Sequence, residues 1–87
     1  MSQDKTSLFE LKSIDTKITR DILNEVYVAL KERGYNPTNQ IVGYLISGDP
    51  GYISSYKEAR SKIQEIDRAK IVEILLEEFQ KENKWNI

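Results

Sequence analysis

The stretch GYNPTNQIVGYLISGDP, residues 34–50, contains both a helix start and a helix stop. Asn36 is a suitable cap, and Pro37 fits the first helical position, where its missing N–H costs nothing. Gly48 is the expected stop, since glycine reaches the left-handed conformation without steric cost. The apolar run between these signals fits a buried strand or a buried helix. The flanking signals favour the helix, although Gly43 inside it would cost ~1 kcal/mol relative to alanine.

Upstream of this stretch, apolar residues recur every four positions, as in one face of a helix. These residues are Ile18, Ile22, Val26 and Leu30. We therefore predict a first helix that starts at Asp15 or Thr16, with Asp15 as its cap, and stops at Gly34. Gly34 and Gly48 should both have positive φ, so a β-branched substitute at either would cost about 1 kcal/mol or more.

Downstream, Pro50 is suited to begin a single helical turn. Ser55 and Glu58 have capping-box spacing, which predicts a third long helix over residues 56–66. Asp67 should end that helix and cap a last helix over residues 68–82. The last helix carries more apolar residues than one narrow stripe needs, and we expect a second copy of the chain to cover part of this excess. The residues proposed for that interface are Leu75, Leu76 and Phe79.

These patterns predict an all-α protein, a compact bundle of about four to five short helices that forms a homodimer. Residues 1–14 are polar and are expected to form a mobile N-terminal arm. Residues 15–82 are expected to be a helical dimerisation domain, and residues 83–87 a C-terminal tail. A chain of 87 residues is expected to be only marginally stable alone, and oligomerisation is a common way to stabilise such a short chain.

The composition argues against several classes of protein. The chain has no cysteine and no histidine, which removes Ser-His and Cys-His catalysis and the usual zinc and haem ligands. A formal net charge of −1 supplies no global attraction to nucleic acid or to anionic lipid. No apolar run is long enough for a membrane span or a signal peptide. We expect a cytoplasmic, non-enzymatic protein without cofactor or metal, not inserted in a membrane.

Two basic residues, Lys57 and Arg60, stand three positions apart in the predicted third helix. On one helix face they could dock a phosphate group or an acidic partner, and the alternative is an ordinary charged surface. A small DNA-binding helical regulator is the competing function, because short helices joined by glycine turns suit a helix-turn-helix. The net charge and the lack of a clearly basic recognition helix argue against it.

The stretch from Val26 to Pro50, with the core GYNPxNQIVGYLxSGDP, resembles the signature of the IreB family of regulatory phosphoproteins. The similarity extends over about residues 4–80. It implies a homodimeric helical fold in the cytoplasm of low-GC Gram-positive bacteria. It also implies control by a membrane-anchored, cell-wall-sensing Ser/Thr kinase and by a cognate phosphatase. The implied output is the cell-envelope stress response and tolerance of cell-wall antibiotics, and the downstream protein target is not indicated.

The resemblance also indicates the phosphoacceptor. In the family it lies in an N-terminal segment similar to Asp4-Lys5-Thr6, and Thr6 falls on the threonine of that pattern. Some members have a second threonine three residues earlier, where this chain has Gln3. Phosphorylation at the single site Thr6 is therefore expected, with Ser7 or Ser2 as possible substitutes.

Overall fold

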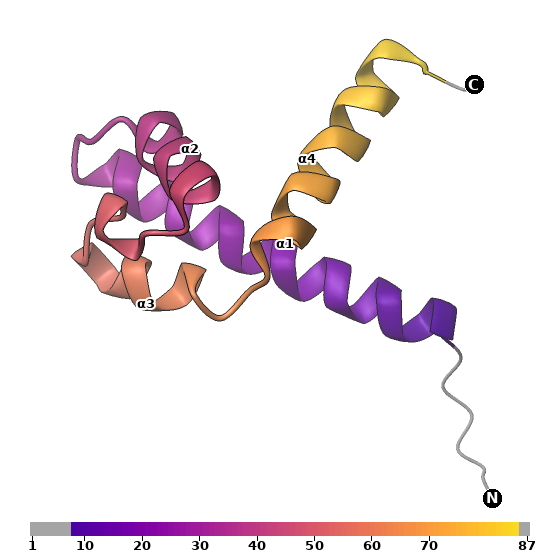
Figure 1. Ribbon diagram of the computed structural model, residues 1–87, viewed down its shortest axis with the longest axis horizontal. Coiled ribbons are helices and arrows are strands. Elements are labelled where there is room, and N and C mark those ends of the chain that lie inside the picture. Colours follow the sequence, from indigo (N-terminus) through magenta and orange to yellow (C-terminus); the bar gives the residue numbers. More distant parts are fainter. Residues whose placement is uncertain (1–7, 86–87) are drawn as a thin grey trace, which may run out of the picture.

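The computed structural model describes residues 8–85, and these residues form helices and turns without a β-strand (Figure 1). The α-helices are α1 (Leu8–Glu32), α2 (Pro37–Ser47), α3 (Ala59–Ile63) and α4 (Arg68–Asn83). Two single 3-10 turns, η1 (Pro50–Tyr52) and η2 (Tyr56–Glu58), lie between α2 and α3. The predicted all-α class is confirmed. The helices are not uniformly short, since α1 has 25 residues and α3 has five.

Helix α1 begins at Leu8, so the predicted start at Asp15 or Thr16 is wrong. Residues 8–14 belong to the helix and not to the predicted N-terminal arm. Asp15 is not a cap: its carbonyl accepts a hydrogen bond from Thr19 Oγ1 at 2.8 Å inside α1. Residues 8–14 contain no glycine or proline, and their apolar residues Leu11 and Ile14 continue the helical spacing toward Ile18.

Helix α2 confirms the start and stop predicted from the central stretch. The Asn36 side chain accepts from the backbone N–H of Asn39 at 3.1 Å, and Pro37 is the first helical residue. Gly48 ends the helix with φ +76°, and Gly34 ends the preceding helix with φ +88°. Packing explains why position 43 is a glycine inside a helix, because a Cβ there would lie 2.5 Å from Cδ1 of the Tyr52 ring.

The segment after α2 agrees with the prediction at its two ends and differs in the middle. The turn η1 begins at Pro50, and the Asp67 side chain caps α4 by accepting from the N–H of Ala69 at 3.1 Å. The predicted third helix over residues 56–66 is wrong, because regular helix covers only α3. The predicted capping box is also wrong: the Ser55 side chain makes no capping bond, and Glu58 has a left-handed backbone.

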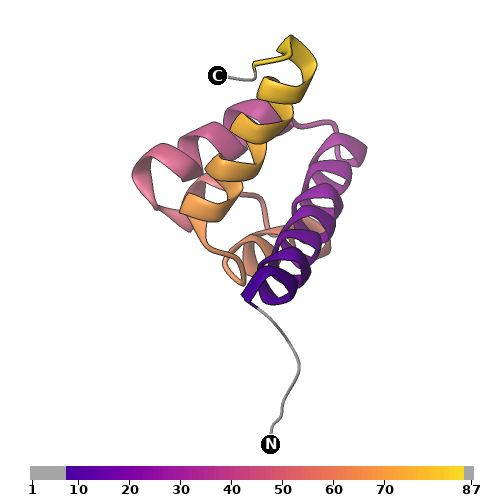
Figure 2. The same cartoon turned by 90° about the vertical axis from the view of Figure 1, so that its right-hand side faces the viewer.

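The core lies between the C-terminal half of α1 and the elements packed against it. In Figure 1, α2 and α3 flank this half of α1, while α4 rises beside the middle of α1 and points away. Figure 2 shows α1 on one side of the molecule and α2 with α4 on the other. The fully buried apolar side chains are Val26, Leu30, Ile53, Ala59, Ile63 and Ile71. The N-terminal half of α1 extends beyond this core.

Candidate functional site

The predicted phosphoacceptors Thr6 and Ser7, with Ser2 and Gln3, lie outside the described residues. The structure does place the point where their segment joins the fold. The first described residue is Leu8, at the end of α1 far from α2 and α3 (Figure 1). The roles of Thr6 and Ser7 stay predictions.

The two predicted docking residues, Lys57 and Arg60, do not share one regular helix. Lys57 lies in η2, and its Nζ forms an ion pair with Glu32 Oε1 at 2.7 Å. This hydrogen bond and the charge of Glu32 raise the pKa of Lys57 above its ordinary value. Arg60 lies in α3, where its Nε donates to the backbone carbonyl of Ile53 at 2.8 Å. Arg60 therefore stabilises the segment between η1 and η2, and one of its N–H donors is already used.

A second cation, Arg33, lies beside Lys57 and was not predicted from the sequence. The guanidinium carbon of Arg33 lies 5.9 Å from the ring centroid of Tyr35 and 5.8 Å from that of Tyr56. Lys57 Nζ lies 5.7 Å from the same Tyr56 ring. These distances fit cation–π attraction. We call Arg33, Tyr35, Tyr56 and Lys57 the cation–tyrosine cluster.

The cluster joins residues from two separate parts of the chain. Arg33 and Tyr35 stand on either side of the glycine that ends α1, whereas Tyr56 and Lys57 belong to η2. Only packing of the segment before α3 against the end of α1 brings them together. In the sequence, an arginine and a tyrosine stand at a helix stop, and a Tyr-Lys pair stands farther along the chain. Neither of these two local patterns predicts contact with the other.

The backbone beneath Lys57 is unusual and firmly held. Lys57 has φ +50° and Glu58 has φ +63°, so two consecutive residues with side chains adopt left-handed conformations. Such conformations cost on the order of 1–3 kcal/mol each and persist only where the surroundings fix them. Here the fixing contacts are Gln40 Oε1 accepting from Ser54 N at 2.9 Å, Ser54 Oγ accepting from Tyr56 N at 3.1 Å, and the bond from Arg60 to Ile53.

The predicted interface residues lie on one exposed side of α4. Leu76 and Phe79 are each 53% exposed, and Val72 and Leu75 are similarly exposed. We call these four residues the α4 apolar face. Their spacing of i, i+3, i+4 and i+7 is the pattern with which one helix packs against another. The Trp85 ring packs edge-on against Phe79, with 5.2 Å between centroids.

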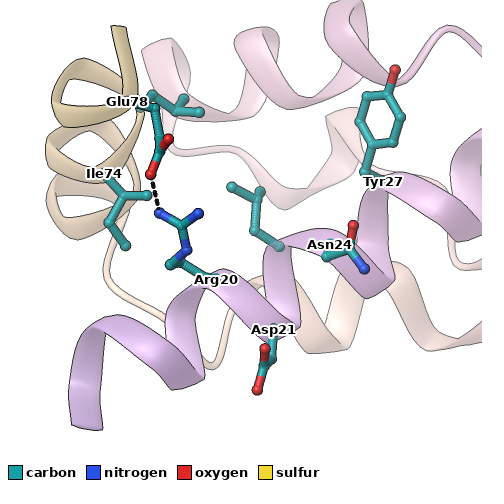
Figure 3. Close-up of a pocket in the computed structure, with 8 residues that line it drawn as sticks. Arg20, Asp21, Asn24, Tyr27, Ile74 and Glu78 are labelled. Carbon is teal, nitrogen blue, oxygen red and sulfur yellow. Dashed lines mark hydrogen bonds and ion pairs between the residues drawn. The ribbon is translucent and has the colours of Figure 1, made fainter. Parts of the chain in front are cut away.

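A cleft of ≈ 450 Å³ separates α1 from α4 (Figure 3). Arg20 of α1 and Glu78 of α4 point toward one another across it and form an ion pair. This contact, with a smaller contribution from Lys81, lowers the pKa of Glu78 below its ordinary value. Asn24 and Tyr27 line the cleft farther along α1. The charged side chains among its described lining residues are Arg20, Asp21 and Glu78.

Between residues 8 and 85, no group of three or more acidic side chains is placed to hold a metal ion. Within the same range, no helix is long and apolar enough to cross a membrane.

The sequence model of the IreB regulatory phosphoprotein family matches residues 4–81. The matched region contains Thr6, the central stretch of residues 34–50, the cation–tyrosine cluster and the α4 apolar face.

Proposed function

Because this chain belongs to the IreB regulatory phosphoprotein family, we propose that it is a non-enzymatic regulator switched by phosphorylation of Thr6. The family match over residues 4–81 is the observation that carries this proposal, since it includes both Thr6 and the helical fold. In this proposal a membrane-anchored, cell-wall-sensing Ser/Thr kinase adds the phosphate, and a cognate phosphatase removes it. The regulator acts in the cytoplasm on a downstream protein, in the control of cell-envelope stress and antibiotic tolerance.

The position of Thr6 supports its assignment as the acceptor. In the sequence, Thr6 comes two residues before Leu8, and the part of α1 that begins at Leu8 extends beyond the core, so we expect a kinase to reach this threonine without opening the core. Within the fold, the Thr19 hydroxyl is less available, because Thr19 is 1% exposed and donates to the carbonyl of Asp15 at 2.8 Å.

The α4 apolar face supports the proposal that the regulator is a homodimer. Half-exposed leucine and phenylalanine side chains in a helix–helix pattern are stabilised when a second apolar surface covers them. Residues Leu75, Leu76 and Phe79 would form the centre of that contact.

No observation favours the competing DNA-binding function. The helix that follows the turns is α3, which has only five residues, too few to lie along a major groove. Its arginine, Arg60, is engaged with the backbone carbonyl of Ile53.

A kinase assay tests the proposed function. The full chain and the variants Thr6→Ala and Ser7→Ala would be incubated with a cell-wall-sensing Ser/Thr kinase of the same cell, and phosphate incorporation measured by mass spectrometry. We expect one phosphate on the parent and on Ser7→Ala and none on Thr6→Ala. Undiminished incorporation into Thr6→Ala would refute the assignment.

A further inference from the structure

We propose that the cation–tyrosine cluster binds the phosphothreonine of a second copy's N-terminal segment, so that the switch acts between copies. This inference rests on the proposed function, because it takes Thr6 as the phosphoacceptor. It changes the predicted docking pair from Lys57 with Arg60 to Lys57 with Arg33.

The donors in the cluster match a phosphomonoester. Arg33 carries five N–H donors and makes no ion pair with a carboxylate among residues 8–85. Lys57 carries three donors, and its one acidic partner among the described residues is Glu32. A phosphothreonine has about −1.5 to −2 charge and three acceptor oxygens, so it competes effectively with a single carboxylate for Lys57. The rings of Tyr35 and Tyr56 hold the guanidinium of Arg33 in place beforehand.

The backbone conformation of η2 is an independent reason to assign a binding role to the cation–tyrosine cluster. Left-handed φ at Lys57 and Glu58 is unfavourable, and three polar contacts from neighbouring segments maintain it. Strained conformations held in this way cluster at binding sites. Here the strained backbone directs Lys57 toward Glu32 at the C-terminal end of α1.

The length of α1 decides which copy supplies the phosphate. From Leu8 to Arg33 the helix rises about 1.5 Å per residue, which separates its ends by about 37 Å. Thr6 lies two residues before Leu8, and two residues of chain span at most about 7 Å. The phosphate therefore falls short of the cluster in its own copy. The proposal therefore requires a two-fold dimer in which the α1 helices run antiparallel, so that each N-terminal segment lies at the cluster of the other copy.

The test uses a synthetic peptide of residues 1–10 carrying phosphothreonine at position 6, titrated into the isotope-labelled full chain. The dissociation constant would be measured by NMR for the parent and for Arg33→Gln and Lys57→Gln. The matched control is Lys17→Gln, which removes the cation of another exposed ion pair, that with Asp21 at 3.1 Å, far along α1. We expect about tenfold weaker binding for each cluster variant, as for the loss of one hydrogen bond to a charged group. The control should bind like the parent.

Three results would overturn the inference. These are equal binding of the unphosphorylated peptide, equal weakening by Lys17→Gln, and binding of inorganic phosphate as tight as that of the phosphopeptide. The variant Arg33→Lys keeps the positive charge and separates a loss of binding from a folding defect. If the cluster is the site, Arg33→Lys should bind the phosphopeptide more tightly than Arg33→Gln. Because the peptide is phosphorylated chemically, failure here is distinct from failure of the kinase assay.

Discussion

Gly34 and Gly48 both have positive φ, yet their surroundings differ. A Cβ at Gly34 would meet no atom within 4 Å, so only the backbone conformation opposes a side chain there. A Cβ at Gly48 would lie 2.9 Å from the guanidinium of Arg68, whose Nη1 donates to the carbonyl of Leu45 at 3.0 Å. Substitution at Gly48 thus disturbs both the backbone and a contact between α2 and α4.

We therefore predict that alanine is more costly at Gly48 than at Gly34. Gly34→Ala should lower the free energy of unfolding by about 1 kcal/mol through φ alone. Gly48→Ala should lower it further, by up to about 1 kcal/mol for the displaced hydrogen bond. Urea melts with and without Arg68→Ala measure the difference. If Gly48→Ala costs the same in both backgrounds, Arg68 has no part in the effect.

For single residues, contacts with neighbours in the sequence were predictable, and contacts between residues far apart in the chain were not. Asn36, Gly48 and Asp67 act on backbone groups a few residues away, so their types and positions suffice to identify them. The approach of Arg33 to Tyr56 joins residues far apart in the chain, and it depends on how α1 packs against η2. No local pattern contains that information.

Among the elements, α2 and η1 meet where Gly43 faces Tyr52. Alanine in place of glycine normally stabilises a helix interior by about 1 kcal/mol. Here we predict the opposite sign for Gly43→Ala, because the added Cβ would clash with the Tyr52 ring and displace it. Thermal melts should show a lower Tm for Gly43→Ala in the parent and a higher Tm in a Tyr52→Ala background. A raised Tm in both backgrounds would mean that the ring moves aside freely.

The contact between α1 and α4 should weaken in acid. Arg20 lowers the pKa of Glu78 in the folded chain, so the unfolded chain binds the proton more readily. The contribution of this pair to stability is therefore present above the ordinary carboxyl pKa and is lost as pH falls through the lowered value. Unfolding of the parent and of Glu78→Gln would be compared between about pH 5 and pH 3. We expect the parent to lose its advantage over the variant in this range.

A suitable control for this comparison is Glu82→Gln, which removes another carboxylate of α4, one that makes no ion pair in the described chain. It should leave the acid dependence of the parent unchanged. An equal effect of both variants would indicate general charge repulsion instead of the specific pair with Arg20.

The elements themselves were predicted unevenly, for physical reasons. The positions of α2 and α4 follow from strong caps at both starts. The start of α1 was placed too late because charged residues among Leu11 and Ile14 obscured a stripe that is still helical. The third helix was predicted too long because the spacing of Ser55 and Glu58 fits a capping box, whereas the bonds to Ser54 and Ile53 hold a different backbone.

For the whole molecule, we predict that a charge on the α4 apolar face breaks the proposed homodimer. Leu76→Glu should shift the chain from dimer to monomer, because an interface cannot cover a carboxylate without a partner. The matched control is Val28→Glu on α1, where the parent side chain is also 53% exposed. Light scattering at several micromolar concentrations measures the mass, and circular dichroism checks the helix content. A folded parent that is monomeric at every concentration would contradict the homodimer.

The central claim is that this chain is a regulatory phosphoprotein switched at Thr6. Its most direct test is to map phosphate by mass spectrometry on the protein isolated from its own cells, with and without a cell-wall antibiotic. We predict a single phosphate on Thr6 whose occupancy changes with the treatment, and none within the helices from Leu8 to Asn83. Phosphate found only within those helices, or an unmodified Thr6 under both conditions, would contradict it.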